Sequence, residues 1–199
     1  MSGSEVIRRA TTADLDAILA LERTGFDPAS RWSAGSWTAE LAAPDRCVLV
    51  AGRPPSRAET GSAQAAGAQG PRSAHPTAGA ALVGVATFQL VAETVDLHRV
   101  VVAPEHRGHG VGRALIEAGI VWASQRQGER MLLEVEHDNA PALGLYRRLG
   151  FAELARRSDY YGPGRHALVL RRDIAGAADR LPAGATAGAG DTMTREWNR

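Results

Sequence analysis

Residues 100–115 form an uninterrupted pattern of strand end, glycine-rich loop and helix start, and this pattern limits the possible folds more than any other stretch. Three valines at 100–102 are typical of a strand, Pro104 stops it, and glycines at 108, 110 and 112 lead into a helical apolar period. Amides at a helix N-terminus lack intrahelical acceptors, and the helix dipole adds partial positive charge there. The pattern therefore predicts a backbone site for a phosphate or pyrophosphate.

Spacing excludes two common nucleotide-binding motifs. No Lys-Ser or Lys-Thr pair follows the glycines, as a Walker A loop requires. A dinucleotide fingerprint needs glycine or alanine at its sixth position, where the two possible registers place Arg113 or Leu115. The pattern that remains is Arg107-x-x-Gly110-x-Gly112. A tight turn that uses glycine only for its backbone geometry is the alternative to an anion site.

Length, charge and cysteine content narrow the class of protein. A chain of 199 residues predicts one domain with a sizeable core. A formal net charge of +1 does not favour nucleic acid or an anionic membrane as a partner. Cys47 is the only cysteine, which excludes an internal disulfide and a cysteine cluster for metal. The polar N-terminus and the lack of a long apolar run predict a cytoplasmic protein without a membrane span.

Two segments contain too few apolar residues to pack into a core. Residues 53–79 include no Val, Ile, Leu, Met or aromatic residue, and residues 175–199 are rich in Ala and Gly. Burial of such segments would not offset their ordering entropy. We therefore expect one domain over residues 1–174 with a disordered insertion at 53–79, followed by a disordered tail at 175–199.

Elsewhere, strand-like and helical patterns alternate. Strands are predicted at residues 5–10, 47–51, 81–91, 94–102, 131–136, 151–157 and 166–172. Helices are predicted from Thr12, as a cap, to Phe26, and at residues 31–41, 110–127 and 139–149, with Ser33 or Ser36 as the cap of the second. This mixed order predicts an α/β fold with a central mixed sheet covered by helices.

The residues of the loop and of the region after it carry a resemblance to a known family. Arg107-x-x-Gly110-x-Gly112 is similar to the acetyl-CoA signature of the GCN5-related N-acetyltransferases, the GNAT family. The region after the loop resembles one branch of this family, the ribosomal-protein alanine N-acetyltransferases. The residues that carry this resemblance are Leu133-Glu134-Val135, Asn139, Leu145-Tyr146, Leu149-Gly150-Phe151, Arg157 and Tyr160-Tyr161. The resemblance implies the acyl-CoA N-acyltransferase fold, in which helices flank a twisted, mostly antiparallel sheet, and acetyl-CoA as the cosubstrate.

The resemblance also implies which residues bind the cofactor. In the family the loop amides hold the CoA pyrophosphate, and the preceding strand end pairs with the pantetheine arm as with an added strand. The cofactor-binding residues that follow from this are Val100, Val101, Val102, Arg107, Gly108, His109, Gly110, Val111, Gly112, Arg113 and Asn139. From its position before Ala140-Pro141 alone, Asn139 is also predicted to cap a helix.

Acetyl transfer from a thioester to an amine needs a proton acceptor for the amine and a proton donor for the sulfur. Glu134 lies in an otherwise apolar strand, where a carboxylate is partly desolvated, although an acid paired with an arginine fits the same pattern. Tyr146 lies on a helix face, where ordinary core packing is the alternative. The resemblance makes Glu134 the general base and Tyr146 the general acid, and Glu136 is the second candidate for the base.

Trp32, Arg157 and Tyr160 are implied walls of a peptide slot, with ordinary packing as the alternative. The resemblance implies transfer to a protein N-terminus, such as the N-terminal alanine of a small-subunit ribosomal protein. An α-amine has a pKa near 8 and lysine one near 10.4, so an N-terminal substrate asks less of the base. Acetylation of a lysine side chain or a small-molecule amine, and a non-catalytic acyl-CoA-binding regulator, stay open. No metal is expected, because His106 and His109, although three residues apart, lie in a glycine loop and not on a helix.

Overall fold

The computed structural model describes residues 6–52 and 82–174. Within these residues the strands are β1 (Val6–Arg9), β2 (Arg46–Gly52), β3 (Leu82–Val91), β4 (Thr94–Val102), β5 (Arg130–Glu136), β6 (Ala152–Arg157) and β7 (Ala167–Asp173). The α-helices are α1 (Leu15–Gly25), α2 (Ala34–Ala42), α3 (Val111–Ser124) and α4 (Ala140–Arg148). Short 3-10 helices lie at η1 (Thr12–Asp14), η2 (Pro28–Ser30) and η3 (Pro104–His106). The predicted insertion at 53–79 and tail at 175–199 lie outside the described residues.

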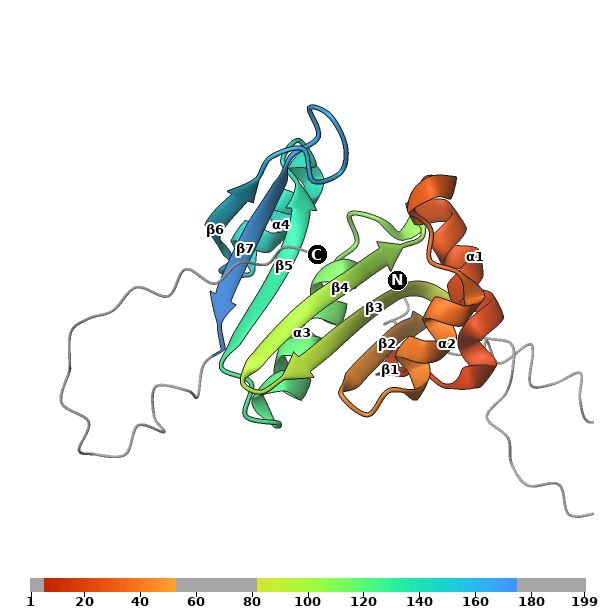
Figure 1. Ribbon diagram of the computed structural model, residues 1–199. Helices are drawn as coiled ribbons and strands as arrows, with labels where there is room; N and C mark the ends of the chain where they lie inside the picture. The colour runs from red at the N-terminus through yellow and green to blue at the C-terminus, as the bar shows by residue number, and fades with distance from the viewer. Residues whose placement is uncertain (1–5, 53–81, 175–199) are drawn as a thin grey trace, which may run out of the picture.

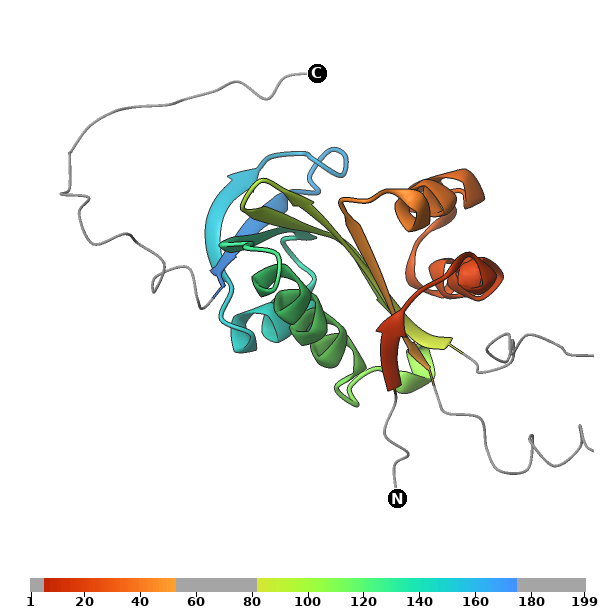
Figure 2. The ribbon, with the colours of Figure 1, turned by 90° about the horizontal axis from the view of Figure 1, so that it is seen from below.

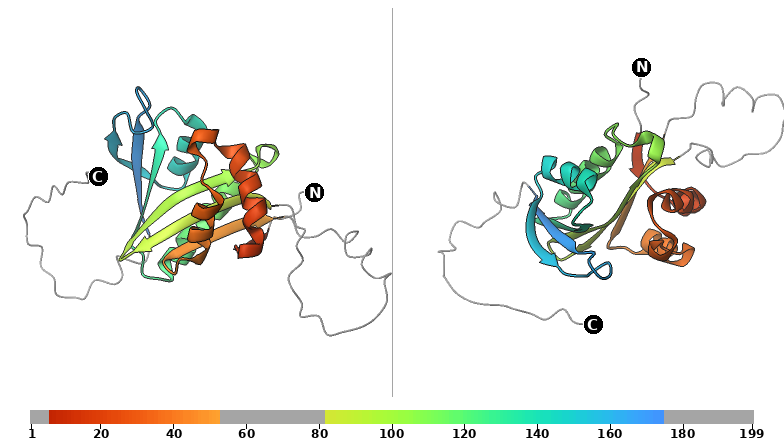
Figure 3. Two further views of the ribbon diagram at one scale, coloured as in Figure 1. Left: turned by 45° about the vertical axis from the view of Figure 1, so that its right-hand side comes forward. Right: turned by 90° about the horizontal axis from the view of Figure 1, so that it is seen from above.

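The described strands form one seven-stranded sheet in the order β1-β2-β3-β4-β5-β7-β6. Neighbouring strands are antiparallel except for β4 and β5, which are parallel. A parallel pair needs a crossover connection, and α3 provides it. Helices α1 and α2 cover one face of the sheet and α3 and α4 the other (Figures 2 and 3). A mostly antiparallel sheet between helices confirms the predicted fold class.

The sheet splits between β4 and β5. The two strands pair from Thr94 opposite Arg130 to Leu97 opposite Leu133, and then they diverge (Figure 1). Beyond this point β4 stays paired with β3 as far as Val102, and β5 stays paired with β7 as far as Glu136. Among the described residues, the edge of β4 that faces β5 therefore has no strand partner from residue 98 onward.

Apolar side chains pack on both faces of the sheet. On the α3 and α4 face the core includes Phe88 and Leu115, and on the α1 and α2 face it includes Ile18 and Trp37, all fully buried. A Cβ added to Gly119 would lie 2.2 Å from Cζ of Phe88, so glycine is required for α3 to approach β3 this closely. The helix next to the loop is thereby held firmly on the sheet.

Two helix starts differ in detail from the sequence prediction. The predicted cap at Thr12 is wrong: Thr12 begins the 3-10 turn η1, and Thr11 is the N-cap, with its backbone N–H donating to Asp14 Oδ2 at 2.8 Å. Of the two candidate caps of α2 the structure selects Ser33, whose Oγ accepts from the Ser36 amide at 3.1 Å. Ser, Thr and Asp are all favourable N-cap residues, so the sequence alone does not decide which of several neighbouring candidates caps a helix.

Candidate active site

The glycine loop has the backbone geometry of an anion site. Gly110 is the N-cap of α3 with φ of 88°, and Gly108 has φ of 78°. A Cβ at either glycine would meet nothing within 4 Å, so the left-handed backbone, rather than lack of space, requires glycine. The first helical hydrogen bond runs from the Ala114 amide to the Gly110 carbonyl at 2.9 Å. The amides of residues 111–113 precede it and have no acceptor within the helix.

The third glycine of the motif is not explained by packing within the protein. A Cβ at Gly112 would lie 3.5 Å from Leu145 and 3.5 Å from Val102, which is ordinary contact, and its φ is not positive. A glycine that neither conformation nor packing requires leaves the backbone bare at the first turn of α3. This is the place where a phosphate would need to approach the amides closely.

Arg107 fixes the loop to the rest of the domain. Its Nε donates to the Val102 carbonyl at 3.0 Å, and its Nη2 donates to the Thr24 carbonyl at 3.2 Å. The guanidinium thus joins the end of β4, the loop and the end of α1, so this side chain contacts protein carbonyls. Arg113 pairs with Glu117 at 2.9 Å, and His109 is exposed. The predicted cofactor contacts of these three side chains stay predictions.

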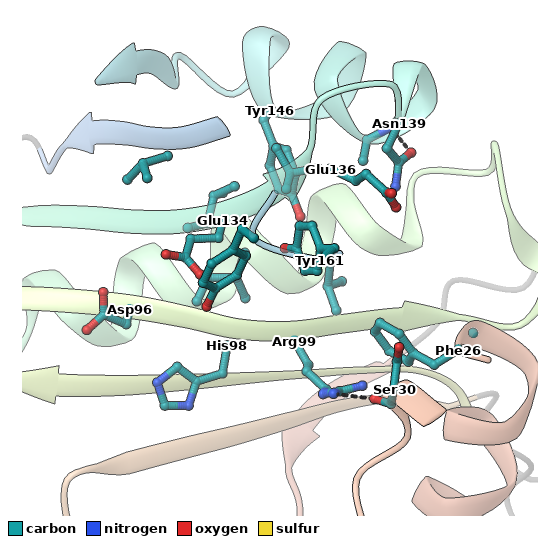
Figure 4. Close-up of a pocket in the computed structure, with 18 of the residues that line it drawn as sticks. Phe26, Ser30, Asp96, His98, Arg99, Glu134, Glu136, Asn139, Tyr146 and Tyr161 are labelled. Atoms are coloured by element: carbon teal, nitrogen blue, oxygen red, sulfur yellow. Dashed lines mark hydrogen bonds between the residues drawn. The ribbon is translucent and has the colours of Figure 1, made fainter. Parts of the chain in front are cut away.

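A cavity of about 830 Å³ lies where β4 and β5 diverge. The ends of α1 and η2, the strands β4 and β5, α4, and the connection between β6 and β7 all line it (Figure 4). Of the predicted site residues it brings together Trp32, Val100, Glu134, Asn139, Tyr146 and Tyr160, with Glu136. Tyr161, the second tyrosine of the Tyr160-Tyr161 pair, lines the cavity as well, and so do four residues that the sequence analysis missed: Asp96, His98, Arg99 and Arg165.

Glu134 is held by a residue of the last hairpin. Arg157 Nη1 donates to Glu134 Oε1, and the Arg157 guanidinium lies 4.2 Å from the centre of the Tyr160 ring. A hydrogen bond with Glu134 raises the pKa of Tyr160. The Glu134 side chain is 30% exposed, so the carboxylate still faces the cavity. The sequence left open whether Glu134 is a desolvated carboxylate or one paired with an arginine. The structure shows the pairing, and it shows that the paired carboxylate still lines the cavity.

Glu136 is less suited to accept a proton. It shares the face of β5 with Glu134, and Arg165 donates to its two carboxylate oxygens at 2.6 and 3.1 Å. The hydrogen bond from Arg165 lowers the pKa of Glu136. Because the ionised form is stabilised, Glu136 is a weaker proton acceptor than an unpaired carboxylate at this position would be.

Tyr146 combines core packing with a hydroxyl that points into the cavity. The residue is 6% exposed, and its ring packs edge-on against Phe151 with centroids 5.7 Å apart. Its hydroxyl points toward Tyr161, between β5 and β4 (Figure 4). Burial, with a smaller contribution from Tyr161, raises the pKa of Tyr146. The phenol therefore keeps its proton at neutral pH, as a proton donor must.

Asn139 caps α4 beside the cavity. Its Oδ1 accepts from the Ala142 amide at 3.2 Å, which confirms the predicted cap. The same residue lines the cavity, so the cap also fixes the direction of a side chain that faces the split. Contact between Asn139 and a cofactor stays a prediction.

Arg99 clamps the wall of the cavity that carries Trp32. Its Nη1 donates to Glu22 Oε1 at 2.6 Å and its Nη2 to the Ser30 carbonyl at 2.7 Å. The guanidinium lies 4.1 Å from the Phe26 ring centre and 4.5 Å from that of Trp32. Glu22, which is 1% exposed, also accepts from the Trp32 amide at 2.8 Å. The clamp, defined as Arg99 with Glu22, thus orders the predicted substrate wall.

Sequence reasoning missed this clamp because Glu22 and Arg99 lie 77 positions apart. Arg99 directly follows a bulge in β4, where the pairing with β3 skips His98. The bulge turns His98 and Arg99 both toward the cavity. An arginine that directly precedes the apolar run 100–102 within a strand was the signal that could have pointed to it.

Other site chemistries gain no support among the residues described. Within 6–52 and 82–174, no group of three or more His, Cys, Asp and Glu residues is placed to hold a metal ion. No helix in the same ranges is long and apolar enough to cross a membrane. Cys47 is buried, and burial raises the pKa of its thiol, so this cysteine lacks the thiolate character of a nucleophile.

The chain is similar in sequence to known acetyltransferases. Residues 62–151 match the family model described as "Acetyltransferase (GNAT) family". N-alpha-acetyltransferase RimI of Mycobacterium tuberculosis is 36% identical over 100 residues, which are 48% of this chain and 61% of that protein. The chain spans about half the length of the curated relatives that it matches.

Two solved structures show the same fold. The ribosomal-protein-S18-alanine N-acetyltransferase of Escherichia coli superposes with a TM-score of 0.68 at 23% identity, covering 90% of this chain and 99% of that one. NAA60 of Arabidopsis thaliana in complex with acetyl-CoA gives 0.66 at 18% identity, covering 87% and 100%. These matches place residues 62–151 with the GNAT N-acetyltransferases, and the relatives of the chain include proteins named RimI.

Proposed function

We propose that the protein transfers an acetyl group from acetyl-CoA to the α-amine of a protein N-terminus in the cytoplasm. The observation that carries this proposal is the split between β4 and β5. On one side it has a glycine loop with free helix amides, and on the other a cavity with a carboxylate and a buried phenol. Relatives named for N-terminal acetylation support the choice of substrate.

The residues at the split fit acetyl-CoA. The β5-facing edge of residues 98–102 presents backbone groups with no strand partner among the described residues, which suits an extended amide-containing arm such as pantetheine. The amides of residues 111–113 and the bare backbone at Gly112 suit the pyrophosphate. We assign cofactor binding to residues 100–102 and 107–113 and to Asn139. Acetyl-CoA supplies the acetyl group as a thioester.

In this proposal Glu134 and Tyr146 move the protons. Glu134 faces the cavity from β5 and accepts a proton from the amine, directly or through water. Tyr146, which stays protonated because burial raises its pKa, donates a proton to the departing sulfur. Arg157 holds the Glu134 carboxylate, and Tyr160 stacks on Arg157. The peptide lies between these hairpin residues and the wall of Trp32 and Phe26.

A panel of short peptides that differ in their first residue tests the proposal, with acetyl-CoA consumption as the readout. We expect turnover on free N-termini, with alanine preferred, and little or none on an N-terminally blocked peptide that carries a free lysine. Turnover on the blocked peptide or on a small amine alone would contradict the N-terminal substrate. Binding of acetyl-CoA without turnover on any amine would indicate a non-catalytic acyl-CoA-binding protein.

A further inference from the structure

The conversion of an ammonium group into an amide removes two protons from nitrogen. The N–C bond forms, the C–S bond breaks, one proton ends on the sulfur, and the other goes to solvent. Glu134 can hold one of these protons at a time. A site that binds the amine in its protonated form at neutral pH is therefore helped by a second proton acceptor beside Glu134.

Asp96 lies on the same face of the sheet as Glu134. Asp96 pairs with Leu132 across the parallel β4–β5 ladder, and paired residues point to the same face. Glu134 is two residues beyond Leu132 on that face, which makes it the diagonal neighbour of Asp96. Both residues line the cavity (Figure 4).

Within residues 6–52 and 82–174, Asp96 differs from the other two carboxylates of the cavity in having no guanidinium partner. Glu134 is engaged by Arg157 and Glu136 by Arg165. Among the described residues, no hydrogen bond or ion pair engages the half-buried Asp96 carboxylate. The titratable groups close enough to influence its ionisation are His98 on the same strand, Glu134 on β5 and Arg46 on β2.

An unpaired, half-buried carboxylate costs stability, which makes Asp96 difficult to explain as a structural residue. Burial, with a smaller contribution from the charge of Glu134, raises the pKa of Asp96. A carboxylate whose basicity is increased in this way is better matched to an amine than one paired with an arginine. Two neighbouring carboxylates in different environments are the arrangement that lets each take a different step.

We propose that Asp96 is a second catalytic carboxylate, which takes the first proton from the substrate ammonium before Glu134 takes the second. Asp96 releases its proton to solvent. The proton on Glu134 returns through water to Tyr146, which has given its own to the sulfur, so that all protons are accounted for. This inference rests on the proposed acetyl transfer to an α-amine.

The test is the pH profile of kcat/KM for a peptide with a free α-amine, measured for the wild type and Asp96→Asn. At about pH 7 we expect Asp96→Asn to lower kcat/KM about tenfold, because only about a tenth of an α-amine with a pKa near 8 is unprotonated at that pH. The deficit should fall to about twofold at about pH 8 and almost vanish near pH 9.5. Asp96→Glu should restore most of the rate. A deficit that is equal at every pH, or no deficit at all, would overturn the proposal.

Two further measurements separate catalysis from folding. Thermal unfolding of Asp96→Asn should occur at the wild-type temperature or above it, because the substitution removes a carboxylate whose ionised form is disfavoured in the folded state. Calorimetric titration with acetyl-CoA should give wild-type affinity. A structural residue would instead show a lowered unfolding temperature. If Asp96→Asn does not fold, Asp96→Ser provides the same pH comparison with a smaller side chain.

A matched control and the wild type complete the design. Asp173→Asn removes an exposed carboxylate at the opposite end of the β5–β7 pair and should leave the pH profile unchanged. If the wild type transfers no acetyl group to any α-amine at any pH, the proposed function itself fails. If the wild type is active and Asp96→Asn equals it, only the role of Asp96 fails.

Discussion

The two sides of the β4–β5 split are built from different kinds of group. The glycine-loop side, residues 100–113, offers backbone amides and a strand edge that is not paired with β5, and Arg107 ties it to carbonyls of the protein. The cavity side offers carboxylates, phenols and guanidinium groups from β4, β5, α4 and the β6–β7 connection. The difference teaches that cofactor binding and proton transfer can be altered separately, because few residues serve both.

Among substitutions on the two sides of the split, Glu134→Gln is expected to have the largest effect on catalysis. The change removes the proposed proton acceptor and keeps the shape of the side chain, so kcat should fall about 100-fold or more. The affinity for acetyl-CoA should stay at the wild-type value, because the glycine-loop side is untouched. Steady-state kinetics and calorimetry measure the two quantities. Glu153→Gln, an exposed glutamate on β6, is the control, and an unchanged kcat would remove Glu134 from the mechanism.

A smaller effect is expected from Tyr146→Phe. The phenyl ring can keep its packing against Phe151, so the midpoint of thermal unfolding should change little. Loss of the hydroxyl removes the proposed proton donor, and kcat should fall about tenfold to 100-fold. If stability falls sharply while kcat per folded molecule stays constant, the hydroxyl acts in packing and the core alternative is correct.

Arg99→Lys tests whether the substrate wall acts independently of the cofactor. Lysine keeps the charge but loses the two-pronged contact with Glu22 and Ser30 and the stacking on Phe26 and Trp32. We expect KM for the peptide to rise about tenfold with little change in kcat, which marks a loss of uniform binding. Arg171→Lys, in an exposed pair with Asp173, is the control. An equal loss of acetyl-CoA affinity would show that the two sides are coupled.

The smallest effect lies outside both sides, at the Arg8–Asp14 pair. The hydrogen bond from Arg8 lowers the pKa of Asp14 to about 2, below its ordinary 3.8. A carboxyl whose pKa is lowered in the folded state stabilises the protein at every pH above its pKa in the unfolded chain. This stabilisation is lost as the pH falls through about 2, the pKa in the folded state. Arg8 is half exposed, so we expect at most about 1 kcal/mol. Urea unfolding of wild type and Asp14→Asn should differ at neutral pH and converge in acid.

The comparison also explains what the sequence could and could not reveal. The glycine-loop side is contiguous, and positive φ at Gly108 and Gly110 leaves a visible pattern of glycines. The Asn139 cap could also be predicted from the sequence, because Asn139 and the Ala142 amide that it accepts from are only three residues apart. Glu134 could likewise be singled out from the sequence, because it lies in an otherwise apolar strand.

The contacts of the cavity side join distant positions. Arg157 is 23 residues from Glu134, and Arg99 is 77 residues from Glu22. The divergence of β4 and β5 depends on where a parallel pairing stops, which no local pattern encodes. For Asp96 the informative observation is that no described residue forms a hydrogen bond or ion pair with its carboxylate. This observation requires the positions of the surrounding residues, which the sequence alone does not give.

Calorimetric titration of acetyl-CoA into the wild type, Gly110→Val and Glu134→Gln tests the separation of the two sides most directly. Valine is strained at the φ of 88° of residue 110, so the loop amides should lose their arrangement. We predict that acetyl-CoA binds the wild type and Glu134→Gln equally and binds Gly110→Val about fivefold to 150-fold more weakly, since strain costs about 1–3 kcal/mol. Equal binding by Gly110→Val, or weakened binding by Glu134→Gln, would contradict the account.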